Sequence, residues 1–169
     1  VRLGHDIKLI PPIYVKPYVK RGKSDAADAE AICEAVTRPT MRFVESKTPD
    51  QQAILALHRT RDLVVRQRTQ TINMLRAPVA EFGIVFAQGV GHATQFAKRL
   101  FEGDSLDLPD TAGNVIAELC EQLLFLHGKI ASYTHEMTQV ARREDRVALL
   151  QTIPGIGPIT ASAIVATIG

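Results

Sequence analysis

Apolar residues recur at alternating spacings of three and four between residues 116 and 140, and this pattern constrains the fold more than any other. The positions are Ile116, Leu119, Leu123, Leu126, Ile130, Tyr133, Met137 and Val140. A helix presents such a heptad seam as one apolar stripe, which a second helix must cover. That second helix can belong to the same chain or to another subunit. The pattern predicts a coiled coil, a mainly α-helical fold, and a homo-oligomer joined through residues 116–140.

A second long helix is predicted to begin at the sequence TPDQ, residues 48–51. Thr48 can cap the helix, Pro49 suits its first position, and Gln51 completes a capping box. Pro78 is expected to end the helix, because proline lacks the N–H group that continues the hydrogen-bond ladder. Six residues form its apolar side: Ile54, Leu57, Val64, Val65, Ile72 and Leu75.

Two arginines of this helix, Arg61 and Arg68, fall within its apolar side. A guanidinium there needs a partner, either a carboxylate or the phosphate of a nucleic acid. Arg59 and Arg66 form a second basic row, and we include Arg76 with them as a candidate nucleic-acid-binding residue. Salt bridges and a solvated face explain these arginines as well as nucleic acid does, so both explanations stay open.

The composition is that of a soluble globular chain. It has 169 residues, and its 46% hydrophobic content is enough for a core. No apolar run is long enough to cross a bilayer and no charged-then-apolar leader opens the chain, so we expect a cytoplasmic protein without a membrane partner. Cys33 and Cys120 lack metal-ligand spacing, which argues against a zinc site or a disulfide framework.

Charge is unevenly distributed along the chain, although the net charge is only +2. Residues 1–80 contain 14 Lys and Arg against 8 Asp and Glu, whereas residues 81–169 contain 6 against 10. The basic half indicates a polyanionic partner, although such asymmetry also occurs without one.

Two carboxylates stand three residues apart in the sequence KSDAADAEAI, residues 23–32. Ser24 is a good N-cap, and acids in the first turn are stabilised by the exposed N–H groups of a helix. Residues at i and i+3 share a helix face, so Asp25 and Asp28 could also bind one hard cation. The ten residues alone favour capping over metal ligation.

The segment that precedes these acids predicts a strand and then a basic loop. HDIKLIPP, residues 5–12, alternates apolar and charged residues and is expected to end as a strand at the two prolines. The loop mixes aromatic and cationic side chains, a combination that suits phosphates and stacked bases as well as plain solvation. These side chains are Tyr14, Lys16, Tyr18, Lys20, Arg21 and Lys23.

Two glycines near the end of the chain, Gly155 and Gly157, lie in the sequence IPGIGP between two apolar segments. This pattern resembles a helix-hairpin-helix, in which backbone N–H groups at a helix start approach a phosphate. An ordinary Gly-rich turn between helices is the alternative.

Three stretches taken together resemble the insertion-sequence transposases of the family numbered one hundred and ten. They are KPYVKRGKSDAADAEAICEA, RTRDLVVRQRTQTINMLRAPVAEFGI and LQTIPGIGPITASAI, and with the segments between them they cover nearly the whole chain. The resemblance implies a RuvC-like, ribonuclease-H-like domain with a D-E-D-D acidic tetrad, a coiled coil, and a C-terminal domain with a catalytic serine. It also implies recombination of DNA guided by a structured RNA.

In that family the last two acids of the tetrad stand in a K-x-D-x-x-D-A motif, which matches Lys23, Asp25, Asp28 and Ala29. The resemblance therefore implies that Asp25 and Asp28 are catalytic ligands of Mg²⁺. The first Asp and the Glu of the tetrad are expected upstream of Val1, and the serine downstream of Gly169. We accordingly read the chain as an internal piece of a longer protein, and expect no DNA strand cleavage from it alone.

The resemblance also gives expected domain bounds. Residues 1–85 would be the C-terminal part of the RuvC-like domain, residues 86–148 a linker and coiled-coil helix, and residues 149–169 the start of the C-terminal transposase domain. The fold is thus expected to be mainly α with a small α/β remnant. A nucleic-acid-binding module without catalysis is the main alternative, and a Holliday-junction resolvase is a weaker one because it has no reason to carry IPGIGP.

Overall fold

The computed structural model describes residues 4–5, 7–20, 22, 24–104 and 106–168. Within these ranges the chain is mainly helical and contains no β-strand. It divides into two compact units at the Pro49–Asp50 boundary, which lies inside the range 1–85 expected to be one domain. We call them the N-terminal unit, which ends at Pro49, and the helical unit, Asp50–Ile168.

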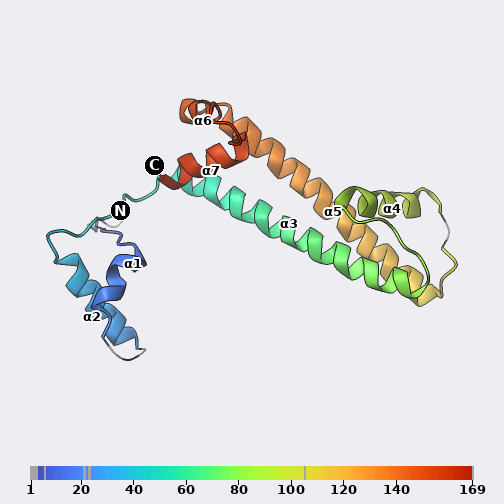
Figure 1. Ribbon diagram of the computed structural model, residues 1–169, viewed down its shortest axis with the longest axis horizontal. Helices are drawn as coiled ribbons and strands as arrows, with labels where there is room; N and C mark the ends of the chain where they lie inside the picture. The colour runs from blue at the N-terminus through green and yellow to red at the C-terminus, as the bar shows by residue number, and fades with distance from the viewer. Residues whose placement is uncertain (1–3, 6, 21, 23, 105, 169) are drawn as a thin grey trace. The chain divides into compact units, whose positions relative to one another are not determined.

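The N-terminal unit contains three short elements (Figure 1): α1, Pro12–Val15, the 3₁₀ helix η1, Lys16–Tyr18, and α2, Asp25–Val36. The two short elements pack against α2. The predicted strand over residues 5–10 is wrong for the described residues, where one isolated antiparallel bridge joins Leu9 to Val44. Its backbone bond runs from Val44 N to Leu9 O at 2.8 Å. A strand needs a ladder of such bonds with a neighbour, and one bond does not make a ladder.

The N-terminal unit has a very small core. Among its described residues, Ala31 and Ala35 of α2 are the buried apolar side chains. Large apolar side chains are instead exposed: Ile7, Leu9, Ile13, Tyr14, Val19, Ile32, Val36, Phe43 and Val44. Burial of apolar area is the main favourable term in folding, so this unit gains little stability from its own packing.

The helical unit is built on two long helices that run side by side in opposite directions (Figure 1), α3, Pro49–Glu81, and α5, Asp110–Ala141. Val64 of α3 packs with Leu126 and Ile130 of α5, and Arg61 of α3 donates to Thr134 of α5. The predicted heptad helix is confirmed. Its seam faces helices of the same chain, with five of its eight residues buried: Ile116, Leu123, Leu126, Ile130 and Met137.

Helix α3 begins at Pro49, as predicted, but the prediction that it ends at Pro78 is wrong because it continues to Glu81. Proline removes one hydrogen bond, to the carbonyl of the residue four positions earlier, which is Met74. Met74 is 57% exposed, so water can reach this turn. Leu75 and Val79, 0% and 1% exposed, anchor the turns on both sides of the proline in the core.

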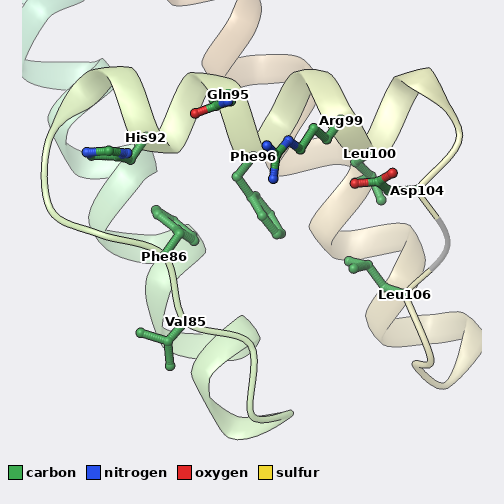
Figure 2. Close-up of a pocket in the computed structure, with 9 residues that line it drawn as sticks. All are labelled: Val85, Phe86, His92, Gln95, Phe96, Arg99, Leu100, Asp104 and Leu106. Carbon is green, nitrogen blue, oxygen red and sulfur yellow. The ribbon is translucent and has the colours of Figure 1, made fainter.

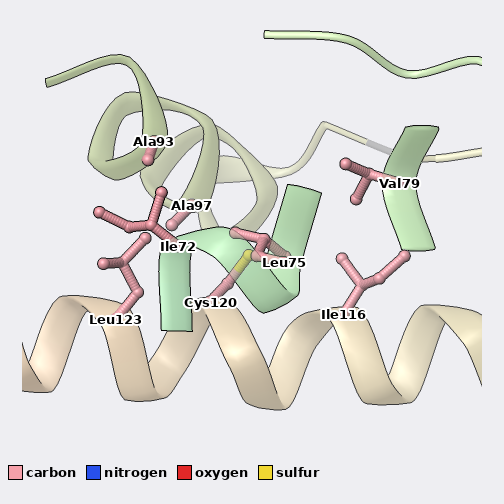
Figure 3. Close-up of a cluster of buried hydrophobic side chains, with 8 residues drawn as sticks. All are labelled: Ile72, Leu75, Val79, Ala93, Ala97, Ile116, Cys120 and Leu123. Carbon is pink, nitrogen blue, oxygen red and sulfur yellow. The ribbon is translucent and has the colours of Figure 1, made fainter. Parts of the chain in front are cut away.

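A third helix, α4, Val90–Glu102, lies against one end of α5. It supplies Ala93 and Ala97 to the largest buried cluster (Figure 3), which α3 and α5 complete. Their contributions are Ile72, Leu75, Val79, Ile116, Cys120 and Leu123. Small alanine side chains let a helix backbone approach the core closely, so this end of the helix pair is covered by a third layer.

Two short helices cover the other end of the unit: α6, Asp145–Leu150, and α7, Pro158–Ile168. Ala141, Val147 and Ala161 form a buried cluster there. His58 Nε2 of α3 lies 2.9 Å from Ser162 Oγ of α7, which ties α7 to α3. No helix in the described ranges is long and apolar enough to cross a membrane.

Candidate functional site

The predicted acidic pair lies in the first turn of α2. Ser24 is the N-cap residue, and its Oγ accepts a hydrogen bond from Ala27 N at 3.3 Å, so the predicted cap is confirmed. The cap fixes the start of the helix, and the helix then places Asp25 and Asp28 one turn apart on one face. Both side chains are exposed, and no ion pair joins either of them to another residue that the structure describes.

Asp28 also borders an open, mostly apolar hollow of about 570 Å³ within the N-terminal unit. Lys8 and Lys16 lie on the same lining as Asp28. The apolar part comes from α2 and from the segment before it: Leu9, Ile10, Val15, Val19, Ile32 and Val36. Asp28 therefore stands at the edge of a surface where charge and exposed apolar groups meet.

The two carboxylates fit a magnesium site of the open kind. Mg²⁺ keeps several of its waters and is held by one or two carboxylates together with substrate phosphates. Asp25 and Asp28 supply two hard oxygen donors that are accessible to water. The described residues contain no group of three or more His, Cys, Asp or Glu that could hold a metal.

The basic loop before α2 is partly engaged in local contacts. Lys20 forms an ion pair with Glu30 of α2, and this contact raises the pKa of Lys20, first through the hydrogen bond and then through the charge of Glu30. Lys16 is exposed, and Tyr18 lies under the guanidinium of Arg38 at 5.5 Å. Two further predicted contacts, Arg21 and Lys23, lie outside the described residues.

Arg61 and Arg68 of α3 contact side chains of α5 that are not carboxylates. Arg61 Nε donates to Thr134 Oγ1 at 2.9 Å, and Arg68 Nη1 lies 3.5 Å from His127 Nδ1. Arg68 Nε is buried without a hydrogen-bond partner in the described part of the chain. Burial, and then the charge of Arg61, lower the pKa of Arg68, as expected of two cations that share a partly buried strip.

No carboxylate neutralises either arginine among the residues that the structure covers. Of the two partners that the sequence left open, the acid is therefore absent from the described residues. An unpaired buried N–H of a cation is costly, so a site of this kind favours an anion that completes it.

The other predicted basic residues of α3 differ in how free they are. Arg59 is exposed, and Arg66 forms an ion pair with Asp62 at 3.0 Å. Arg76 Nη2 donates to Ala87 O at 2.7 Å, and its guanidinium lies 4.7 Å from the centre of the Phe86 ring. Arg76 thus holds the loop after α3, and Arg59 is the freest cation of the three.

The predicted glycine turn connects α6 to α7. Gly155 has φ +89°, a conformation that glycine adopts more easily than other residues, and both Gly155 and Gly157 are exposed. Ile156 N donates to Ile153 O at 3.1 Å and Ala161 N donates to Gly157 O at 2.9 Å. The two glycines are therefore accessible to solvent, whereas Pro158 and Ile159 at the start of α7 are half-buried.

Ser162 is a structural residue in this geometry. Its hydroxyl donates to Ile159 O at 3.1 Å, and its oxygen lies 2.9 Å from His58 Nε2. A serine nucleophile gives its hydroxyl proton to a base, whereas the Ser162 hydroxyl donates a hydrogen bond to this backbone carbonyl. The side chain is also 5% exposed.

One pocket was missed by the sequence analysis. It lies beside α4 and has a volume of about 230 Å³ (Figure 2). Phe86 and Phe96 stack within it, with ring centres 4.9 Å apart, and polar side chains line its α4 side: His92, Gln95 and Arg99. The apolar spacing of Val90, Ala93, Ala97 and Leu100 predicts a helix here and was the available signal.

Comparison with known proteins places the chain among transposases. Residues 2–83 match the DEDD family of the IS110 type, described as "Transposase". A probable family 20 transposase of Pseudomonas aeruginosa is 41% identical over 99% of this chain and 50% of its own length. A putative transposase of Sinorhizobium fredii is 44% identical over 95% of this chain and 41% of its own length.

The transposase for insertion sequence element IS1328 of Yersinia enterocolitica is 39% identical over 99% of this chain and 49% of its own length. The chain thus spans about half the length of the curated relatives it matches. No solved structure matches it. The matched segment contains Asp25 and Asp28 of α2 and the whole of α3, and the relatives extend the match over the rest of the chain. On this agreement, the chain belongs to the DEDD transposases of the IS110 type.

Proposed function

We propose that this chain is part of a DNA transposase and that Asp25 and Asp28 hold a divalent cation, Mg²⁺, at its acidic site. The observation that carries the proposal is the placement of both carboxylates in the first turn of α2, exposed and free of described ion pairs. When bound, the cation supplies activation of an attacking oxygen and stabilisation of a leaving oxygen at a phosphodiester. The chain's own contribution is to keep two oxygen donors on one rigid helix face.

The cations of the chain would bind the polyanionic substrate. Arg61 and Arg68 form a strip without a described counter-charge, and Arg59 adds an exposed guanidinium on the same helix. Guanidinium groups bind phosphate oxygens in pairs, so α3 can follow a nucleic-acid backbone without reading its sequence. We propose DNA and a structured guide RNA as partners, the RNA on the strength of the family resemblance.

The nucleophile is proposed to be a serine other than Ser162 and Ser132. Ser162 is buried and its hydroxyl donates a hydrogen bond to a backbone carbonyl, and Ser132 is an exposed residue of α5. In the 169-residue chain taken by itself, the acidic pair and the basic helix would therefore support binding without strand cleavage.

Transposition in cells tests the proposal. The assay uses the whole open reading frame that encodes these residues. It compares the variants Asp25→Asn and Asp50→Asn. Asp50 is a matched control because it is also an exposed acid in the first turn of a long helix. We expect Asp25→Asn to abolish transposition and Asp50→Asn to retain it. Normal transposition by Asp25→Asn would overturn the assignment.

A nucleic-acid-binding role without catalysis is the second candidate, and the uncompensated Arg61 and Arg68 favour it. Phosphate contacts make binding fall steeply as salt rises. The two candidates differ in one result, because a pure binding module keeps its cellular role when Asp25 is replaced, whereas a transposase loses it.

A further inference from the structure

We propose that the pocket beside α4 binds one unstacked base of single-stranded DNA. This site is separate from the acidic pair and from the basic strip of α3, and it rests on the proposed role in DNA binding. The pocket lies wholly in the helical unit, between α4 and the loops that precede and follow it (Figure 2).

The volume of the pocket limits its occupant to a small group. Its volume of about 230 Å³ falls below the roughly 300–1,000 Å³ of pockets that take drug-sized ligands. One ring system of a nucleotide fits this space, and a whole dinucleotide does not. The occupant must therefore project one group into the pocket and leave its remainder outside.

The aromatic side chains provide a stacking surface. Phe86 and Phe96 lie nearly parallel, with 18° between their planes. Figure 2 shows Phe96 projecting from α4 with Phe86 on one side and Leu106 on the other, all three lining the pocket. Both rings are half-buried and line the pocket, so a base that enters it meets an aromatic wall. Base stacking on aromatic rings is tolerant of sequence, because every base has a π face.

The stacking surface is held in place before any ligand arrives. Arg76 binds Ala87 O and covers the Phe86 ring, which fixes the loop that carries Phe86. Phe96 is held by α4, whose Ala93 and Ala97 are fully buried in the core. A surface that needs no rearrangement avoids the entropy cost of ordering side chains on binding.

Polar groups at the pocket can recognise the rest of a nucleotide. His92, Gln95 and Arg99 are spaced by three and four residues on one face of α4, and Asp104 lines the pocket from the loop that follows. None of these four side chains forms an ion pair or side-chain hydrogen bond with another described residue. Amide and carboxylate groups pair with base edges, and a guanidinium pairs with a flanking phosphate.

These features together favour a base of a single strand over a free apolar ligand. Arg99 and Asp104 are exposed at the pocket and have nothing to bind on an apolar ligand, whereas a nucleotide offers both a phosphate and a polar base edge. A single strand presents its bases already unstacked, so the cost of extruding one is small. We commit to DNA because the family to which the chain belongs consists of transposases.

The test compares two labelled oligomers of equal length by fluorescence anisotropy: oligodeoxyuridylate and its fully abasic counterpart. The wild-type chain should bind oligodeoxyuridylate at least about fivefold more tightly than the abasic oligomer. This factor corresponds to about 1 kcal/mol, the lower end of the free energy expected for stacking of one base. Phe96→Leu should remove this preference, since leucine keeps the packing and loses the aromatic ring. Circular dichroism of each variant checks that it is folded.

Phe125→Leu is the matched control. Phe125 is an exposed phenylalanine of α5 that carries Lys129 over its ring at 5.4 Å, outside the pocket. This variant should keep the full preference for bases. Equal affinity of the wild-type chain for both oligomers would overturn the proposal, as would an unchanged preference in Phe96→Leu or a lost one in Phe125→Leu.

The same measurements separate this proposal from the proposed DNA-binding role of α3. Arg61→Gln combined with Arg68→Gln should weaken binding of both oligomers by the same factor and leave their ratio unchanged. If the two oligomers bind with equal affinity, the base-binding pocket is refuted and the role of the arginines is not. Binding that depends wholly on bases refutes the arginine strip alone. Tighter binding of oligouridylate than of oligodeoxyuridylate would overturn the choice of DNA over RNA.

Discussion

Replacement of Leu75 by alanine is predicted to destabilise the helical unit by about 3 kcal/mol. Leu75 is 0% exposed and lies in the cluster that joins α3, α4 and α5. The substitution removes three carbon atoms from the core, a loss of about 2.4 kcal/mol at roughly 0.8 kcal/mol for each buried methylene. The cavity adds to this loss, and leucine-to-alanine changes in cores cost about 2–5 kcal/mol in total.

The surroundings of Leu75 leave little chance of collapse into the cavity. Ala93, Ala97 and Cys120 of the cluster have no long side chain that can fill the space, and its β-branched members Ile72, Val79 and Ile116 are stiff about χ1. The matched control is Leu63→Ala on the same helix, because Leu63 is 47% exposed. Exposed substitutions of this kind change the free energy of unfolding by about 0.5 kcal/mol or less.

Urea unfolding followed by far-UV circular dichroism measures both variants. With a slope of about 1.5 kcal/mol per molar urea, the Leu75→Ala midpoint should fall by about 2 M and the Leu63→Ala midpoint by less than about 0.4 M. A Leu75→Ala midpoint within about 0.4 M of the wild type would refute the three-helix core. Equal losses for the two variants would refute the orientation of α3.

Three further predictions concern titration and local stability. Burial raises the pKa of the Cys120 thiol to about 11 from 9.0, so the stability that its neutral form contributes should be fully present below pH 9 and be lost between pH 9 and 11. An alkylating reagent at pH 8 should modify exposed Cys33 but not buried Cys120. Burial lowers the pKa of His58 from 6.5, so the stability from its neutral form is present above pH 6.5 and is lost as the pH falls through the lowered value. His58→Gln can still bond Ser162, and it should reduce this dependence of the free energy of unfolding on pH, measured by urea unfolding. The N-terminal unit should exchange its amide hydrogens much faster than α5, since it buries little apolar surface, and equal protection of the two would contradict this.

Local patterns predicted the helices well where one signal dominated. Ser24 before two acids and Pro49 after a threonine gave two helix starts that the structure confirms. The heptad spacing gave α5, because a stripe that needs covering is a property of the sequence itself. The sequence left open what covers the stripe, and the structure answers with α3 of the same chain.

Predictions failed where the deciding contact comes from another segment. Pro78 does not end α3, because Leu75 and Val79 are fixed in a core that α4 and α5 complete. The segment around Leu9 is not a strand, because a strand depends on a neighbour that no local pattern reveals. The phosphate contact of Arg76 stays a prediction, but its bond to Ala87 O could not be foreseen, because this bond depends on how the loop after α3 turns back.

The candidate site also combines features that the sequence predicts with features that it does not. Helical geometry alone puts Asp25 and Asp28 on one face, and this much follows from their spacing. The partners of Arg61 and Arg68 come from α5, 73 and 59 residues later in the chain, so their lack of a carboxylate partner among the described residues needed the structure. The pocket beside α4 joins a helix to two loops, and its residues have no shared sequence signature.

The central claim is that Asp25 and Asp28 hold a divalent cation, and a Mn²⁺ titration of the folded chain tests it most directly. Mn²⁺ stands in for Mg²⁺ and broadens the NMR signals of amides near its binding site. The account predicts broadening centred on residues 24–29, its loss in Asp25→Asn combined with Asp28→Asn, and its retention in Asp50→Asn. Broadening that persists in the double variant, or that is as strong around Asp50 as around α2, would contradict it.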